Sequence, residues 1–145
     1  MRRLIGKMRM LTVAEWEILI TSTIMHPLVA LLLRATGYNG TRNILLDLIP
    51  GQKRHMCPAD TDMDKVYCMA RMVAVAARYG FHRADCLTHA LVLWWLLARR
   101  GIASRIRFGV LRFPAVEFSA HVWVECMGRS LNEADARCRY AVFNN

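Results

Sequence analysis

The chain has 145 residues, enough for one domain, and its 55% hydrophobic and 21% charged composition excludes a disordered protein. The formal net charge of +9 comes from 20 Lys and Arg that are spread along the whole chain. The clustered basic stripe of a nucleic-acid-binding protein is missing, so a single domain over residues 1–145 that does not bind nucleic acid is predicted.

The first third of the chain is predicted to be helical. Thr12 followed by Glu15 has capping-box spacing, so a helix is expected from Thr12 to about His26, where Pro27 kinks or ends it. The apolar stretch 18–33 is 16 residues long, short of the ~20 that a membrane span needs. It predicts a buried or partner-facing helix and no transmembrane segment.

Two shorter helical pieces are expected over residues 28–35 and 41–49, and the second is closed by Pro50 and Gly51. Together with the first helix they define a predicted helical N-terminal subdomain over residues 1–60. The remaining residues, 61–145, are predicted to form the core of the domain.

That core begins with two helices. Thr61 with Asp64 fits a helix N-cap, and apolar residues recur at helical spacing up to Gly80. Asp85 is predicted to cap a second helix over residues 86–99, whose run LVLWWLL is apolar on all sides. A helix of this kind belongs in the centre of a core, with other elements packed on more than one face.

After Gly101 the hydrophobic period changes from helical to alternating. Residues 102–110 and 120–126 read as two strands joined by a loop over 112–119, and a tight turn at Gly128 leads to a short return strand over 130–133. The order of elements predicts an α+β fold in which the second core helix packs on a small antiparallel sheet.

The five cysteines give an odd count without a C-x-x-C pair or a preceding signal peptide. A disulfide framework or a zinc knuckle is therefore not expected, and the histidines lack the spacing of a metal site. The chain is predicted to be cytoplasmic, with reduced thiols and no metal.

Cys86 is predicted in the first turn of its helix, where free N–H groups and the helix dipole stabilise a thiolate. A small apolar core residue is the competing interpretation. His121 is predicted on a strand, facing the same side as Trp123 and Glu125, so it offers a base for a nucleophilic cysteine. Trp123 either shields such a pair from water or fills the core, and Glu125 either orients a neighbour or is a solvated strand residue.

A third, acidic group would hold the histidine in place. If the turn at Gly128 has an odd number of residues, Glu133 faces Trp123 and Asp135 faces His121 across the hairpin, whereas an even turn moves both to the other side. The local register permits either carboxylate and does not choose between them.

The run CLTHALVLWWLLARRGIASRIRFGV, followed by FSAHVWVECMGRSLNE, resembles the leader peptidases of lasso peptide biosynthesis in bacteria. The resemblance implies a transglutaminase-like cysteine peptidase fold, with Cys86 as nucleophile, His121 as base and Glu133 at the position of the triad aspartate. Asp135 is the alternative acid. The chain departs from the family pattern at His89, where Arg is frequent, at Val122, where Ala is usual, and at Glu133.

By this resemblance the substrate is a ribosomal precursor peptide, cut between leader and core without a cofactor. The stand-alone form of the peptidase works with a separate leader-recognition protein and delivers the core to an ATP-dependent lasso cyclase. Two alternatives stay open, a transglutaminase-like acyltransferase and an inactive peptide-binding scaffold of the same fold.

Overall fold

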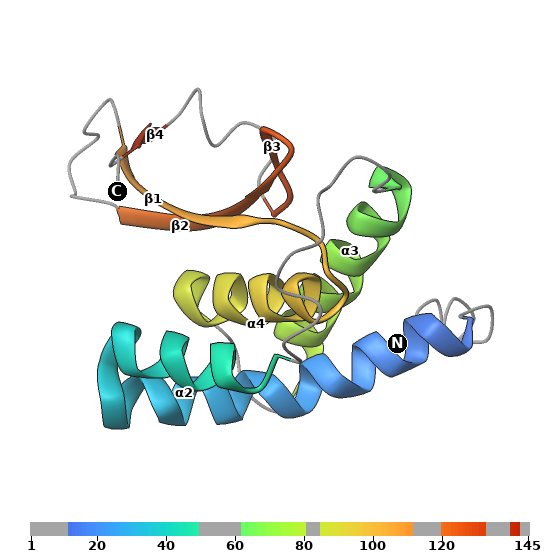
Figure 1. The fold of residues 1–145 in the computed structure, drawn as a ribbon, viewed down its shortest axis with the longest axis horizontal. Helices are drawn as coiled ribbons and strands as arrows, with labels where there is room; N and C mark the ends of the chain where they lie inside the picture. Colours follow the sequence, from blue (N-terminus) through green and yellow to red (C-terminus); the bar gives the residue numbers. More distant parts are fainter. Residues whose placement is uncertain (1–11, 50–61, 81–84, 112–119, 133–139, 143–145) are drawn as a thin grey trace.

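A computed structural model of the chain describes residues 12–49, 62–80, 85–111, 120–132 and 140–142. Its helices are α2 (Val13–Asp47), α3 (Met63–Tyr79) and α4 (Cys86–Arg99), and its strands are β1 (Arg105–Leu111), β2 (Ala120–Cys126), β3 (Arg129–Ser130) and β4 (Tyr140–Val142). The strands form one sheet in the order β3-β2-β1-β4, and α4 lies between this sheet and α2 (Figure 1). The predicted α+β class is confirmed.

Helix α2 starts as predicted and ends differently. Thr12 and Glu15 form the expected capping box, in which the Thr12 N–H donates to Glu15 Oε2 at 2.8 Å. The predicted end of the helix at Pro27 is wrong, because α2 continues through Pro27. The break between the predicted pieces 28–35 and 41–49 is present at Gly37, with φ of +69°. Buried side chains on both sides of Pro27 hold the helix together against the loss of one backbone hydrogen bond, whereas glycine adopts a left-handed φ without strain.

Helices α3 and α4 begin at aspartate caps. Asp62 accepts from the Asp64 N–H at 3.1 Å, one residue later than the predicted cap at Thr61, which lies outside the described residues. Asp85 accepts from the Thr88 N–H at 2.7 Å, and α4 has the predicted bounds. All its side chains from Ala90 to Leu97 are buried between α2, α3 and the sheet, which confirms its central place.

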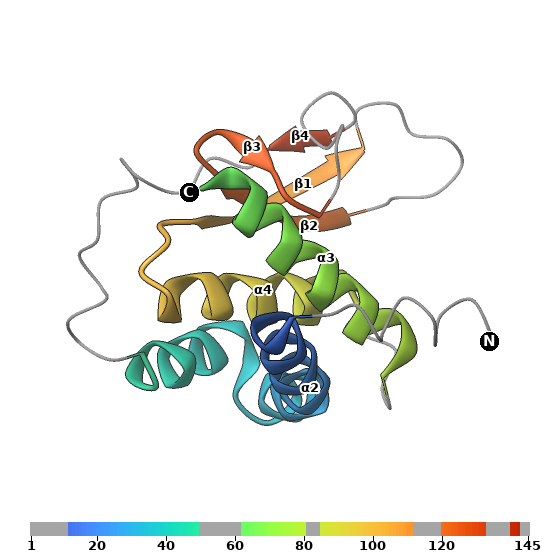
Figure 2. The same cartoon turned by 90° about the vertical axis from the view of Figure 1, so that its right-hand side faces the viewer.

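The sheet differs from the prediction at its margins. Strands β1 and β2 pair antiparallel as expected, but β1 starts at Arg105, three residues late. The turn before β3 contains two residues, Met127 and Gly128, both with left-handed φ, as hairpin turns of this length prefer. The return strand is only Arg129–Ser130, and β4, which was not predicted, pairs with β1 at the sheet edge (Figure 2). The predicted loop 112–119 lies outside the described residues.

Among the described helices, α2 is long and apolar enough to cross a membrane by length and composition, a test that core helices of soluble proteins also pass. One side of α2 packs on α3 and α4, and the helix buries three polar residues, Ser22, His26 and Thr41. Hence α2 is attached to the domain along one face.

Candidate active site

Cys86 is the first residue of α4, and its half-buried side chain packs against the core cluster. The cap at Asp85 uses the amide of Thr88, three residues further on, as its donor. Cys86 therefore lies at the amino end of α4, where the backbone N–H groups of the first turn have no partner within the helix.

Two other described cysteines, Cys68 and Cys126, have raised pKa values. Burial raises the pKa of Cys126, and its Sγ donates to the Ala103 carbonyl at 3.4 Å. Burial and the adjacent Glu15 carboxylate raise the pKa of Cys68, which donates to Glu15 Oε1 at 3.1 Å. Both thiols are thus kept protonated and engaged in structural hydrogen bonds, while Cys57 and Cys138 lie outside the described residues.

A group of histidines surrounds the first turn of α4. His89 lies one turn after Cys86 on the same side of the helix. Its ring is 6.0 Å from that of His26, which comes from α2 and whose Nδ1 contacts the Ser22 carbonyl. Burial, together with the nearby His26 and His121, lowers the pKa of His89 to about 4. His89 is therefore neutral at physiological pH.

His121 contributes to the lowered pKa of His89. Figure 1 shows that the first turn of α4 and the beginning of β2 lie at the same end of the two layers. Cys86 and His121 therefore belong to elements that begin at the same end of the molecule. His89 and His26 join them, and sequence reasoning had given neither a role in the site.

His121 belongs to a ladder of side chains along β2. Val122 and Val124 point to the face that packs on α4, so His121, Trp123 and Glu125 share the other face. The His121 ring stacks on Trp123, with centroids 6.3 Å apart and planes 17° from parallel. Trp123 is fully buried, so it fills space in the fold, and its ring covers one side of the His121 ring.

Glu125 holds the Trp123 side chain of this ladder in place through hydrogen bonds. Its carboxylate is buried, and it accepts from Trp123 Nε1 at 3.2 Å and from Arg107 Nε at 3.1 Å. Of the two interpretations of Glu125, the structure supports the one in which it orients a neighbour. The neighbour is the indole on which His121 stacks.

Both candidate acids, Glu133 and Asp135, lie outside the described residues. The turn before β3 is even, so the odd-turn register that sets Glu133 opposite Trp123 and Asp135 opposite His121 does not apply. The last described residue before Glu133 is Asn132, whose Oδ1 accepts from the Val124 N–H at 2.9 Å. This side chain takes the place of a backbone acceptor for the Val124 N–H beyond the end of β3.

No group of three or more His, Cys, Asp or Glu side chains in the described part of the chain is arranged to hold a metal ion. What the described residues offer is a thiol at the start of α4 and an imidazole near the start of β2, the strand that packs on that helix. A thiol and an imidazole are the two groups that nucleophilic acyl transfer through a thioester uses.

A sequence model of the transglutaminase-like superfamily matches residues 28–145. The match begins inside α2 and includes α3, α4 and the whole sheet. No curated protein and no solved structure matches the chain significantly.

Proposed function

Because the chain belongs to the transglutaminase-like superfamily, whose members include cysteine peptidases and acyltransferases, we propose that it is a cysteine peptidase acting on a ribosomally made lasso precursor peptide. It removes the leader and frees the N-terminus of the core for macrolactam closure. The observation that carries the enzymatic part of the proposal is the position of Cys86 at the start of a buried central helix. The lasso substrate is supported by the motifs around Cys86 and His121.

The proposed reaction proceeds in two acyl-transfer steps. The Cys86 thiolate attacks the carbonyl carbon of the scissile peptide bond, the C–N bond breaks, and the leaving amine takes a proton from the His121 imidazolium. A thioester on Cys86 remains. Water then attacks the thioester, His121 accepts its proton, and the C–S bond breaks to release the leader carboxylate. In this proposal the N–H of Cys86, at the start of α4, donates to the oxyanion.

The proposal includes a third member for the site and partners for the protein. Glu133 orients His121, with Asp135 as the alternative acid. A separate leader-recognition protein delivers the precursor, and an ATP-dependent lasso cyclase takes the product, all in the cytoplasm. The positive net charge of +9 favours association with acidic partners.

The test uses purified protein, a synthetic lasso precursor and a leader-recognition protein, followed by mass spectrometry. Cleavage adds the mass of one water over the two products, whereas amide formation with loss of ammonia would identify an acyltransferase. Cys86→Ala should abolish processing, and the matched control Cys68→Ala should keep it. Peptide binding without cleavage by the wild-type chain would identify the scaffold alternative, and processing by Cys86→Ala would refute the assigned nucleophile.

A further inference from the structure

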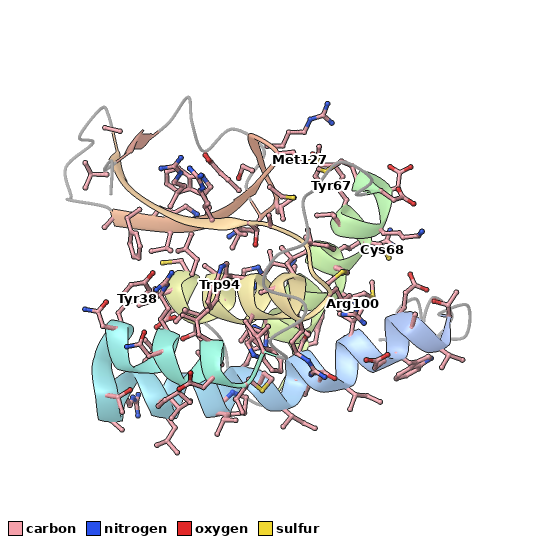
Figure 3. The ribbon with its side chains drawn as sticks, in the orientation of Figure 1. Tyr38, Tyr67, Cys68, Trp94, Arg100 and Met127 are labelled. Atoms are coloured by element: carbon pink, nitrogen blue, oxygen red, sulfur yellow. The ribbon has the colours of Figure 1, made fainter. Side chains whose placement is uncertain are left out.

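The side of α2 that faces away from the domain is apolar. Its exposed residues recur every three or four positions, as expected for one side of a helix. They are Val13, Trp16, Ile20, Ile24, Leu28 and Leu31. We call this set the α2 stripe. Figure 3 shows side chains projecting from α2 on the side opposite α4.

The α2 stripe is large for a surface without a partner. Ile20, Ile24 and Leu31 expose 54%, 62% and 64% of their area, and the six side chains together expose roughly 600 Å², the upper end for an apolar patch on a monomer. Over its length of about 27 Å, the same helix side carries charges only near its ends, at Glu17 and Arg34.

We propose that the α2 stripe is the interface of an antiparallel homodimer. In this dimer the two α2 helices run antiparallel, and the two-fold axis crosses them at the level between residues 25 and 26. Ile20 of one copy then lies opposite Leu31 of the other, and Ile24 lies opposite Pro27. The alignment also sets Glu17 level with Arg34 of the other copy, twice by symmetry. The surface is thus complementary to itself in both apolar contacts and charge.

The area and the charges favour a second copy over other occupants. Two stripes bury about 1,200 Å², the lower limit of a specific interface, which predicts a dimer that dissociates on dilution. An anionic bilayer would attract Arg34 and repel Glu17, whereas a second copy uses both. Glu17 also pairs with Arg100 of its own chain at 3.7 Å, yet it keeps 68% of its side chain exposed for another cation.

The dimer leaves the candidate active site open. The α2 stripe is on the side of α2 away from α4, whereas Cys86 is on α4 between α2 and the sheet. Failure of the dimer proposal would therefore leave the proposed peptidase function untouched, and the two are measured by separate assays.

Sedimentation equilibrium over about 1 to 200 µM, spanning the range of a weak interface, tests the proposal. The wild-type chain should dimerise reversibly, and Ile24→Glu should be monomeric. Arg34→Glu should weaken the dimer about tenfold, because two ion pairs become two repulsions. The double variant Glu17→Arg/Arg34→Glu should restore it, since each new charge again lies level with its opposite in the other copy.

Lys65→Glu on α3 is the matched control, because Lys65 is an exposed charge away from the α2 stripe, and it should leave the dimer unchanged. Thermal melting of each variant verifies that it is folded. A wild-type chain that stays monomeric overturns the proposal, and so does a double variant that fails to recover. Binding of a monomeric wild-type chain to phosphatidylglycerol vesicles, lost in Ile24→Glu, would assign the stripe to a membrane instead.

Discussion

Replacing His89 by glutamine should remove a large part of the pH dependence of stability. In the folded chain the pKa of His89 is lowered from 6.5 to about 4, first because burial penalises the imidazolium and then because His26 and His121 repel it. Between these two values the unfolded chain binds a proton that the folded chain does not. The contribution of neutral His89 to the free energy of unfolding is therefore fully present above pH 6.5. It is lost as the pH falls from 6.5 toward 4.

The magnitude follows from the two pKa values. The gap between 6.5 and about 4 corresponds to about 3 kcal/mol at roughly 1.4 kcal/mol per unit. Most of this loss falls within a convenient range, because the change from pH 7.5 to pH 5 removes about 2 kcal/mol of the free energy of unfolding. Above pH 5 few carboxylates are protonated, so the histidines dominate the change.

Urea denaturation of the wild-type chain and of His89→Gln at pH 7.5 and pH 5 measures the effect. The wild-type free energy of unfolding should fall by about 2 kcal/mol more than that of the variant. His26 and His121 are present in both proteins, so the difference between the two proteins reports on His89. Equal falls in the two proteins would refute the reasoning, since they would mean that His89 is protonated equally well in both states.

Three further substitutions test the packing around the site, each by urea denaturation. Gly109→Ala should cost about 1–3 kcal/mol, because the new Cβ would lie 2.8 Å from the Ala141 carbonyl oxygen of the neighbouring strand; an unchanged midpoint would contradict the close approach of β4 to β1. Asp85→Ala should cost about 1 kcal/mol, and Asp85→Ser, which keeps a capping oxygen, much less. Glu125→Ala should cost about 3 kcal/mol, since it leaves Arg107 without its buried acceptor, and Glu125→Gln should cost less.

The elements that the sequence predicted well are those in which local and tertiary forces agree. Helix α4 has a strong cap at Asp85, an uninterrupted apolar run and a terminal Gly101, and its predicted bounds are those of the structure. Strand β2 has its predicted bounds, and its partner β1 starts three residues later and ends one residue later than predicted. In each case the hydrophobic periodicity and the local propensities favour the same element that tertiary packing stabilises.

The failures arise where tertiary contacts outweigh a local rule. Proline tends to end a helix, but here the packed residues around Pro27 sustain α2 through it, and the break lies at Gly37, between the second and third predicted helical pieces. Strand β4 has three residues and exists through its pairing with β1. A segment this short has no hydrophobic pattern from which a strand could be predicted. Strand β3 ends at Ser130, short of the predicted residue 133, and beyond it the Asn132 side chain accepts from the Val124 amide in place of a backbone acceptor. His89 and His26 meet only because α4 crosses α2.

Helix α2 shows why an apolar segment does not by itself specify what covers it. Its sequence is hydrophobic on all sides between Ile18 and Leu33, which typically indicates burial on every face. In the structure Met25 and Val29 are buried against the domain while Ile24 remains largely exposed. The buried face packs on α3 and α4, whereas the exposed face, within the part of the chain that the structure describes, makes no contact that stabilises the folded monomer. Isoleucines on a solvent-facing side cost solubility without stabilising the monomer, so their presence argues for a contact outside it.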